Sequence, residues 1–424
     1  MTEKTSSFVF NPVKVAEKML KTGDFLCVDG RFFLYKRGLF FYFSHIEIYR
    51  KIKEFMGTKY RERYGREVIH CMELERLKRF EDINSHKNML NLKDGMFDLD
   101  NMILFPHDPK YLSTIQLDLI YNKDAKCDLW EKTLNEIFLD VHWKIECLQE
   151  YMGYCLTTDN SYQLALLNVG QGANGKSLIY RVFEAILGQY NISSVPMAKL
   201  KDQHYLAELF GKLVNISLES EAIEELSDAN FKAIVSGDRI TADEKYKKPF
   251  SFYPFCKLIF SMNTLPFVND KTEAFYRRIL ILNYEKQFKT GEQNRNLYKE
   301  LLEEIPGIFN WMVEGLERLR KRGSFNIPDG MQKLIDEYKK DNNPTLSFIE
   351  ENLDRGKNTT VSKKDVYNKY VLWCKENGYK TSSDKSLGKN IRTFFNGTVV
   401  DGRNNIRREW VNLQWKAENV DWDD

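Results

Sequence analysis

A short glycine-rich segment places the strongest constraint on how this chain can fold. The segment runs from Gly170 to Ser177 and reads Gly-Gln-Gly-Ala-Asn-Gly-Lys-Ser. Apolar residues 164–169 precede it, and a helix-like run, 178–187, follows it. Glycines leave the backbone N–H groups of such a loop open to phosphate oxygens, and the next helix begins beside them. The order strand, loop, helix therefore predicts an α/β core with a phosphate-binding P-loop.

Two side chains at the end of this loop suit a bound triphosphate. Lys176 would reach the β- and γ-phosphates, and the hydroxyl of Ser177 would join the shell of a Mg²⁺ ion. The sequence thus predicts ATP or GTP as a ligand, bound together with Mg²⁺. The predicted nucleotide-binding residues are Gly170, Gly172, Ala173, Asn174, Gly175, Lys176, Ser177 and Leu178.

A second apolar segment ends in acidic side chains. Residues 212–218 read as a buried strand, and Glu219, Ser220 and Glu221 follow them. One carboxylate would organise magnesium-bound water, and the other would polarise the water that attacks the phosphate. The alternative is a pair of solvated acids at a strand end. We expect Glu219 to contact the metal, and the choice of the residue that activates water stays open.

A third apolar segment, residues 257–262, ends at Asn263. Asparagine is common in turns, so its position after two other strands is what makes it a candidate. If this strand lies beside residues 164–169, the Asn263 amide would hydrogen-bond the γ-phosphate or the attacking water. We predict a catalytic role for Asn263 on that basis.

Two arginines, Arg277 and Arg278, stand just before the apolar run 279–282. A guanidinium group is a fixed positive fork that stabilises charge on a transferring phosphoryl group, and a neighbouring subunit can supply it. Both arginines are candidate catalytic residues. A structural salt bridge is the alternative for one of the two.

Residues 239–253 have the pattern of a hairpin with a basic tip. Two β-favouring stretches flank the tip, which presents ammonium groups and one aromatic ring to a phosphodiester backbone and its bases. A solvated charged turn is the alternative. The candidate DNA-binding residues are Lys245, Tyr246, Lys247 and Lys248.

The order of these motifs resembles a superfamily 3 helicase of the AAA+ class. It is most similar to the branch found at the carboxy end of phage and plasmid primases and in the poxvirus primase-helicase. The resemblance covers roughly residues 85–415 and rests on coordinated motifs. These are the loop at 170–177, Ser236-Gly237-Asp238 before the hairpin, Phe275-Tyr276-Arg277-Arg278 after the third strand, and a pre-helicase segment at 91–121.

The resemblance implies a role for each candidate residue. Lys176 and Ser177 resemble the Walker A pair, Asn263 the sensor asparagine, and Arg277 the arginine finger. Lys245 and Tyr246 are similar to the DNA-contacting tip of the family's hairpin. Glu219 and Glu221 resemble the Walker B acids, although related helicases often have adjacent acids and Ser220 separates these two.

The family further implies a homo-oligomeric ring, expected to be a hexamer, with single-stranded DNA in its channel. The narrower resemblance is to a stand-alone replication initiator and self-loading helicase of a phage or a staphylococcal pathogenicity island. A different class of function stays open: an ATP-dependent switch that assembles on an origin without unwinding it. The basic hairpin and the arginine pair favour the motor, because a switch needs neither.

The carboxy-terminal part of the chain is basic, although the whole chain has a net charge of only +2. Residues 355–416 contain 14 lysines and arginines against five acids. Helix-like stretches are followed by a small hairpin around residues 401–403, which predicts a winged-helix domain. The excess of positive charge suits DNA phosphates, so we expect this domain to bind the origin duplex. A basic but purely structural lid is the alternative.

The amino-terminal part contains two aromatic segments, residues 31–35 and 39–42, on either side of a turn at Lys36-Arg37-Gly38. This pattern predicts a hairpin. Aromatic side chains at strand spacing fill a core more often than they form a platform for bases, so we expect these to be buried. Farther along, Asp98 and Asp100 could hold polymerase magnesium ions, but Asp100-Asn101 has turn chemistry and favours a turn.

We therefore expect an α/β P-loop AAA+ core with an α+β amino-terminal region, a helical pre-helicase segment and a winged helix. The expected limits are 1–85 for the amino-terminal domain, 86–158 for the pre-helicase segment, 159–330 for the core, 345–416 for the winged helix and 417–424 for an acidic tail.

The composition excludes several other classes of protein. No apolar run approaches the ~20 residues that span a bilayer, so we expect no membrane helix. The first seven residues are mostly polar and begin no signal peptide, which predicts a cytoplasmic protein. The resemblance to phage and pathogenicity-island proteins implies that this is the cytoplasm of a bacterial host. Seven widely spaced cysteines form no C-x-x-C pair, which argues against a zinc site or a disulfide framework.

Overall fold

The computed structural model describes residues 9–220, 228–245, 248–268, 273–289, 291, 294–403 and 408–416, and of Glu219, Ser220 and Asp228 it describes the backbone alone. The chain forms two compact units. Unit 1 comprises Met1–Pro266 and Arg277–Pro328, and unit 2 comprises Phe267–Tyr276 and Asp329–Asp424. None of the helices in these described ranges has the length and apolar character needed to cross a membrane.

A five-stranded parallel sheet forms the centre of unit 1. Its strand order is β13-β7-β12-β9-β8, and the strands are β7 (Ala165–Val169), β8 (Ile192–Ser193), β9 (Val214–Ser220), β12 (Lys257–Met262) and β13 (Ile279–Asn283). Strands β7 and β12 are almost wholly buried because helices cover both faces of the sheet. The α/β fold with a parallel sheet is thus confirmed.

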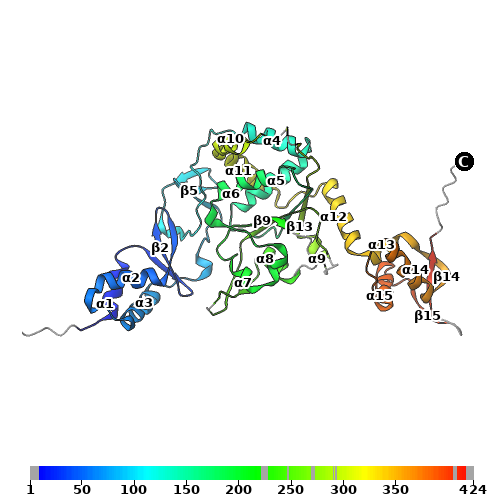
Figure 1. Ribbon diagram of the computed structural model, residues 1–424, viewed down its shortest axis with the longest axis horizontal. Helices are drawn as coiled ribbons and strands as arrows, with labels where there is room; N and C mark the ends of the chain where they lie inside the picture. Colours follow the sequence, from blue (N-terminus) through cyan, green and yellow to red (C-terminus); the bar gives the residue numbers. More distant parts are fainter. Residues whose placement is uncertain are drawn as a thin grey trace, which may run out of the picture. The chain divides into compact units, whose positions relative to one another are not determined.

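Helices surround this sheet on two sides. In Figure 1, α5 and α11 lie on one side of β9 and β13, and α7 and α8 lie on the other. The helices of this part are α4 (Asp128–Phe138), α5 (His142–Cys155), α6 (Lys176–Leu187), α7 (Gln203–Ala207), α8 (Asp228–Ser236), α10 (Leu297–Glu303) and α11 (Ile305–Arg322). Helices α4 and α5 lie within residues 86–158, the segment expected to be helical.

The amino-terminal part of unit 1 is a three-stranded antiparallel sheet with helices. Its elements are α1 (Pro12–Leu20), β1 (Phe25–Val28), β2 (Arg31–Lys36), β3 (Leu39–Phe43), α2 (His45–Met56) and α3 (Glu62–Arg76). The predicted hairpin is confirmed by the pairing of β2 with β3. Phe32 and Phe40 are buried as expected, whereas Phe41 and Tyr42 are 43% and 56% exposed, so the prediction of a core role is wrong for them. The reason is that β3 is an edge strand of this sheet.

A second small antiparallel sheet contains the Asp-x-Asp pair. It consists of β4 (Met89–Leu92), β5 (Gly95–Asp98) and β6 (Ile103–Phe105). The Asp98 carboxylate accepts hydrogen bonds from the backbone N–H of Asp100 at 2.8 Å and from the side-chain amide of Asn101 at 2.8 Å. These bonds hold the pKa of Asp98 below its usual value, with the Asn101 amide as the main cause. The turn prediction for this segment is confirmed.

Within its described residues, unit 2 contains three helices, a strand, two helices and two strands in chain order. Its elements are α9 (Glu273–Tyr276), α12 (Asp329–Asn342), α13 (Pro344–Asn352), β14 (Leu353–Ser362), α14 (Lys363–Glu376), α15 (Asp384–Phe394), β15 (Val400–Arg403) and β16 (Arg408–Trp415). The three strands form an antiparallel sheet in the order β14-β16-β15. Sequence patterns indicated the helices and the final hairpin but missed β14, whose residues are mostly polar.

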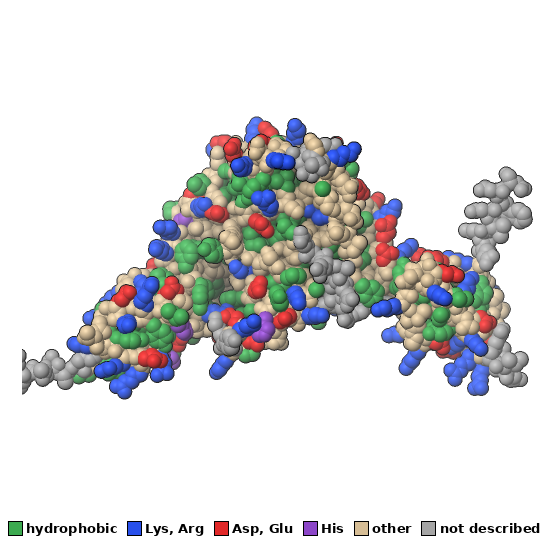
Figure 2. All heavy atoms as spheres, in the orientation of Figure 1, with side chains coloured by type: hydrophobic (Ala, Val, Ile, Leu, Met, Phe, Trp, Pro, Cys, Tyr) green, Lys and Arg blue, Asp and Glu red, His purple; other side chains and the backbone are tan. Residues whose placement is uncertain are grey.

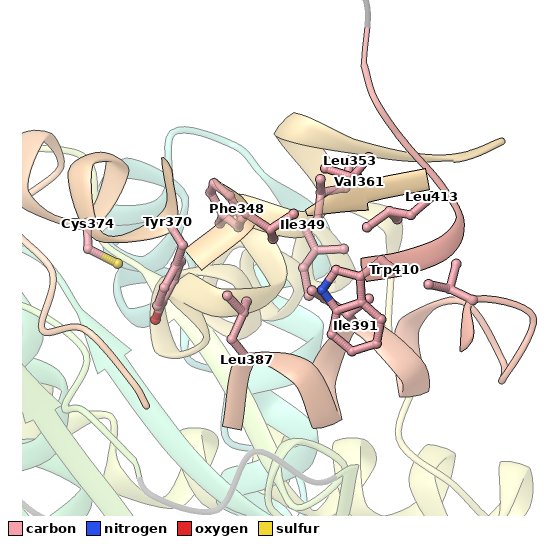
Figure 3. Packing of buried hydrophobic residues seen from close by; sticks show 12 residues of the cluster. Phe348, Ile349, Leu353, Val361, Tyr370, Cys374, Leu387, Ile391, Trp410 and Leu413 are labelled. Atoms are coloured by element: carbon pink, nitrogen blue, oxygen red, sulfur yellow. The ribbon is translucent and has the colours of Figure 1, made fainter. Parts of the chain in front are cut away.

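The hydrophobic core of unit 2 lies between this sheet and helices α13 to α15. Figure 3 shows Leu387 and Ile391 of α15 on the same side as Ile349 of α13 and Trp410 of β16. All four side chains are at most 3% exposed. The opposite side of α15 is consequently left for solvent or for a partner.

Candidate nucleotide site and nucleic-acid interface

The predicted P-loop connects the end of β7 to the start of α6. The N–H of Gly170 donates a hydrogen bond to the carbonyl of Met262 at 3.1 Å, which joins the loop to the end of β12. A Cβ atom at Gly170 would lie 2.6 Å from the Tyr284 carbonyl oxygen. Gly175 has φ +89°, and a Cβ there would lie 2.5 Å from Cδ1 of Ile137. Glycine is therefore required at both positions by the close packing of the loop.

Lys176 begins α6 with its side chain inside the loop. It is only 8% exposed, and its ammonium group donates a hydrogen bond to the Gly170 carbonyl. The same nitrogen lies 5.6 Å from the centre of the Tyr284 ring. Burial lowers the pKa of Lys176 from its ordinary value. A buried cation within a loop of backbone N–H groups is suited to an anionic ligand.

The other predicted loop residues differ in how accessible they are. Asn174 is buried, and its side chain donates to the Gln171 carbonyl and accepts from the Lys176 N–H, so it shapes the loop. Ser177 is exposed on the first turn of α6, where a hydroxyl oxygen would be open to Mg²⁺. Exposed residues Gly172 and Ala173 and half-buried Leu178 complete the predicted set. The donors present therefore fit a magnesium–nucleotide ligand.

A buried polar cluster beneath the loop was missed by sequence reasoning. Asn168 of β7 is fully buried, and its Oδ1 accepts hydrogen bonds from the hydroxyls of Tyr180 at 2.8 Å and Tyr284 at 3.1 Å. Its amide donates to the carbonyl of Phe260 at 3.3 Å. The cluster joins β7 to α6, β12 and the residue that follows β13. Its only signal in the sequence is one asparagine in an otherwise apolar strand.

The register of the sheet brings the other strand ends to the same edge as the loop. Met262 of β12 is level with Val169 of β7 on one side and with Ser220 of β9 on the other. Asn263 follows Met262 directly and is exposed. The backbone of Glu219 belongs to β9 at this level, while its side chain and all of Glu221 lie outside the described residues. Ligands of open α/β sheets bind at this carboxyl edge.

The two arginines lie at the opposite end of the strands, where the strands of the parallel sheet begin. The Arg278 carbonyl accepts a hydrogen bond from Ala165, the first residue of β7, at 2.8 Å. Four residues of strand separate Ala165 from Val169, a distance of about 13 Å at 3.3 Å per residue. The guanidinium of Arg278 donates to the hydroxyl of Ser236 through Nε at 3.3 Å and Nη2 at 3.2 Å. Arg277 is exposed.

The predicted hairpin is present between α8 and β12. Its strands are β10 (Ile240–Ala242) and β11 (Phe250–Phe252), which pair antiparallel. Lys245 and Lys248 are exposed near the tip, and Tyr246 and Lys247 lie outside the described residues. In the connection between the two hairpin strands, Glu244 accepts a hydrogen bond from Arg31 of β2 at 2.6 Å. The sequence contained no signal for that contact.

Comparison with protein families finds matches over three parts of the chain. Residues 20–139 match the family described as D5 N terminal like, and residues 340–423 match that described as Poxvirus D5 protein-like. Residues 168–278, which include the P-loop and the hairpin, match a family of unknown function, DUF5906.

Curated relatives include two viral proteins. "Putative helicase L207/L206" of Acanthamoeba polyphaga mimivirus is 24% identical over 326 residues, which cover 70% of this chain and 34% of that protein. "Putative helicase 184R" of Invertebrate iridescent virus 6 is 21% identical over 364 residues, which cover 74% of this chain and 37% of that protein. The chain thus spans about a third of the length of these relatives.

Solved structures with a similar fold include two apo structures of the NrS-1 C-terminal region. One has a TM-score of 0.56 at 14% identity and covers 96% of this chain and 99% of that one. The other has a TM-score of 0.57 at 12% identity, with 96% and 100% covered. Two parts of this chain are thus similar to D5-type families, and the solved structures share its fold.

Proposed function

We propose that this chain is an ATP-driven DNA helicase that initiates replication of a mobile genetic element. The observation that carries the proposal is the arrangement around the parallel sheet. The P-loop and Asn263 lie at its carboxyl edge, and Arg277 lies at its amino edge. This arrangement suits a motor in which one subunit completes the site of the next.

In this proposal Lys176 binds the β- and γ-phosphates of ATP, and Ser177 and Glu219 hold Mg²⁺. When bound, the metal ion would neutralise charge on the transferring phosphoryl group. Glu219 or Glu221 polarises the attacking water, and Asn263 orients that water or the γ-phosphate. The exposed position of Asn263 directly after the strand beside β7 supports its part.

Arg277 is proposed to act on the nucleotide of a neighbouring subunit. An arginine side chain extends about 7 Å, whereas the strand between the two edges of the sheet alone measures about 13 Å. The chain's own P-loop is therefore out of reach. A finger that acts only on a neighbour requires a head-to-tail interface, and such an interface forms a ring when the rotation between subunits closes. We propose a homo-oligomeric ring, most simply a hexamer. Arg278, bonded to Ser236, supports the end of β13.

Two surfaces are proposed to bind DNA. The hairpin tip, with Lys245, Tyr246, Lys247 and Lys248, would hold single-stranded DNA in the channel of the ring. Unit 2 would bind the origin duplex as a winged helix, which its order of helices and strands supports.

The surface charge of unit 2 agrees with the second assignment. Figure 2 shows Lys and Arg side chains gathered on the side of unit 2 where Figure 1 places α15 and β15. Lys385, Lys389 and Arg392 are exposed along one face of α15, three and four residues apart, opposite Leu387 and Ile391. That spacing places three cations on a single stripe of the helix.

The origin in a phage or a staphylococcal pathogenicity island, and the cytoplasm of a bacterial host as location, remain predictions from the sequence resemblance. The expected domain limits at residues 85, 158, 330, 345 and 416 also remain predictions.

The first experiment measures ATP hydrolysis and unwinding of forked DNA by Lys176→Ala. Loss of the cation that faces the phosphates should abolish both activities while the fold is kept. Lys201→Ala removes an exposed lysine from the same unit and serves as control. Wild-type turnover by Lys176→Ala would refute the nucleotide site.

A second experiment separates the motor from an assembly switch that binds an origin without unwinding. Lys245→Ala combined with Lys248→Ala removes two exposed charges from the hairpin tip. A motor should keep its basal ATPase and its origin binding but lose unwinding and DNA-stimulated ATPase. A switch should lose only a little salt-dependent affinity. Lys132→Ala combined with Lys201→Ala removes two exposed lysines elsewhere and is the matched control.

A further inference from the structure

A wide groove with a volume of about 1210 Å³ lies within unit 1. It is bounded by the amino-terminal sheet, the segment around residues 114–118 and the base of the β10–β11 hairpin. Aromatic side chains line it from both sides. They come from β2 and β3 on one side and from β11 and the loop after it on the other, and include Phe33, Phe40, Phe41, Tyr42, Phe252 and Tyr253.

Three of these rings are open to solvent. Phe41 is 43% exposed, Tyr42 is 56% exposed and Tyr253 is 55% exposed. Large aromatic side chains normally bury most of their surface in a folded protein, so three exposed rings along one groove indicate a surface for a partner. Phe41 and Tyr42 belong to β3, and Tyr253 directly follows β11.

The backbone beneath two of the rings is firmly held. The N–H of Phe40 donates to the Ser113 carbonyl at 2.9 Å, and the Asn91 amide donates to the Gly38 carbonyl at 2.8 Å. A third bond runs from the side chain of Gln116, which lines the groove, to the Arg37 carbonyl at 3.3 Å. The β2–β3 turn is thereby fixed at the rim, and the rings of β3 are presented on a rigid support.

Most of the acidic charge in the groove is already neutralised. Of the acids that line it, Glu244 pairs with Arg31, Asp159 with Lys87, and Asp118 with Lys93. The remaining acid of the described lining, Glu81, is exposed to solvent.

Positive charge remains on the floor of the groove and on two turns that adjoin it. Lys36 and Arg37 are exposed at the β2–β3 turn. Lys212 lines the groove with its ammonium group bonded to the Tyr190 carbonyl at 2.6 Å. Lys245, on the hairpin, is exposed one residue beyond Glu244, which itself lines the groove. Within the described lining, Lys212 balances Glu81, and the exposed cations of the two adjoining turns favour an anionic partner.

We propose that this groove binds single-stranded nucleic acid, with unpaired bases stacked on Phe41, Tyr42 and Tyr253. Exposed rings beside cations are the combination by which proteins hold single strands without sequence preference. A duplex does not fit this role because its base faces are stacked on each other. The proposal rests on the proposed helicase function in one respect: the strand held at the hairpin tip would continue into the groove, past Glu244 and Tyr253.

The test measures affinity for an oligothymidylate of about 16 nucleotides, a length at the upper end of common site sizes, by fluorescence anisotropy without nucleotide. Phe41→Ala combined with Tyr42→Ala should weaken binding about tenfold or more, because two stacking surfaces for bases are lost. Affinity for a duplex of the same length should stay unchanged. Phe105→Ala removes a ring that is 41% exposed but does not line the groove, and should have no effect.

Two further variants separate stacking from a fault in folding. Tyr42→Trp keeps a stacking surface and should keep single-strand affinity. Tyr253→Ala alters a ring on a different element and should weaken binding on its own, with unchanged thermal unfolding. Unchanged oligothymidylate affinity in both alanine variants would overturn the proposal. Equal losses of affinity for the single strand and for the duplex would also overturn it. So would a loss of oligomers while single-strand affinity is unchanged, because that result would assign the rings to a protein partner.

The oligothymidylate affinities of the ring variants are also measured in proteins that carry Lys176→Ala. These affinities then test the groove separately from ATP-driven unwinding. If Lys176→Ala still hydrolyses ATP, the helicase proposal fails while the groove is judged on binding alone. If ATP hydrolysis behaves as proposed but the ring variants bind normally, the groove assignment fails and the motor stands.

Discussion

The guanidinium group of Arg31 donates a 2.6 Å hydrogen bond to the carboxylate of Glu244, a residue 213 positions later in the chain. Its planar face lies 4.3 Å from the ring centre of Phe210 and 4.0 Å from that of Phe250. One side chain thus joins the amino-terminal sheet to the hairpin proposed to hold DNA. Stacking and a charged hydrogen bond together make this a stronger contact than an ordinary surface pair.

Removing this contact should loosen the hairpin. In Arg31→Ala we expect faster amide hydrogen exchange in residues 240–252, because local opening becomes easier when a stabilising contact is lost. Arg79→Ala is the control, since Arg79 pairs with Asp82 only at the surface, with a side chain 80% exposed. Equal exchange of the hairpin amides in both variants would show that Arg31 does not support the hairpin.

Glu150 should be a large contributor to stability. Its side chain is 4% exposed and accepts hydrogen bonds from Arg318 at 2.8 Å and from Arg322 at 3.0 Å, which joins α5 to α11. Glu150→Ala would leave both cations unpaired and should cost about 3 kcal/mol, at the lower end for a broken buried pair because the arginines are partly exposed. Glu146→Ala, at an exposed site on the same helix, should cost under about 0.5 kcal/mol. Similar urea midpoints for the two variants would contradict this.

Lys257 predicts a pH dependence of stability. The residue is 2% exposed, its ammonium group donates to the carbonyls of Thr157 and Phe255, and burial lowers its pKa to about 8 from 10.5. Between these values the unfolded chain binds a proton that the folded chain does not. The Lys257 contribution to stability should therefore rise with pH across this window, by about 3 kcal/mol in total.

The measurement compares the free energies of unfolding of the wild type and of Lys257→Met from pH 8 to 10.5. Buried thiols and tyrosines lower stability at high pH in both proteins, so only the difference between the two is informative. As the pH rises, the free energy of unfolding of the wild type should increase steadily relative to that of Lys257→Met. Parallel curves would show that Lys257 keeps an ordinary pKa.

Two inactive variants should restore activity when mixed. Arg277→Ala should bind ATP without hydrolysing it, and Lys176→Ala supplies an intact arginine to its neighbour. Random co-assembly leaves about one interface in four with both groups, so partial turnover should return. Lys176→Ala mixed with Ser177→Ala is the matched control, because no interface then has an intact loop. Absence of rescue in subunits shown to co-assemble would exclude a finger that acts between subunits.

Local patterns predicted the elements that depend on local chemistry. The P-loop, the strands around it and the β10–β11 hairpin follow from glycine spacing, apolar runs and turn residues. The order of the strands in the sheet is set by packing between distant segments, and no local pattern encodes it. Asn168 and Arg31 were missed for the same reason: each acquires its partners only when residues 12 to 213 positions away fold against it. The exposure of Phe41 and Tyr42 likewise depends on what covers β3.

The separation of Arg277 from the P-loop has a kinetic consequence. In the proposed ring, a solitary chain holds halves of two different active sites, so its turnover should depend on how often chains meet. Specific activity should fall on dilution below the dissociation constant of the assembly and recover on concentration, as in any reaction whose catalyst must first form from its parts. ATP would thus be hydrolysed only by assembled subunits, which would couple hydrolysis to assembly at the proposed origin.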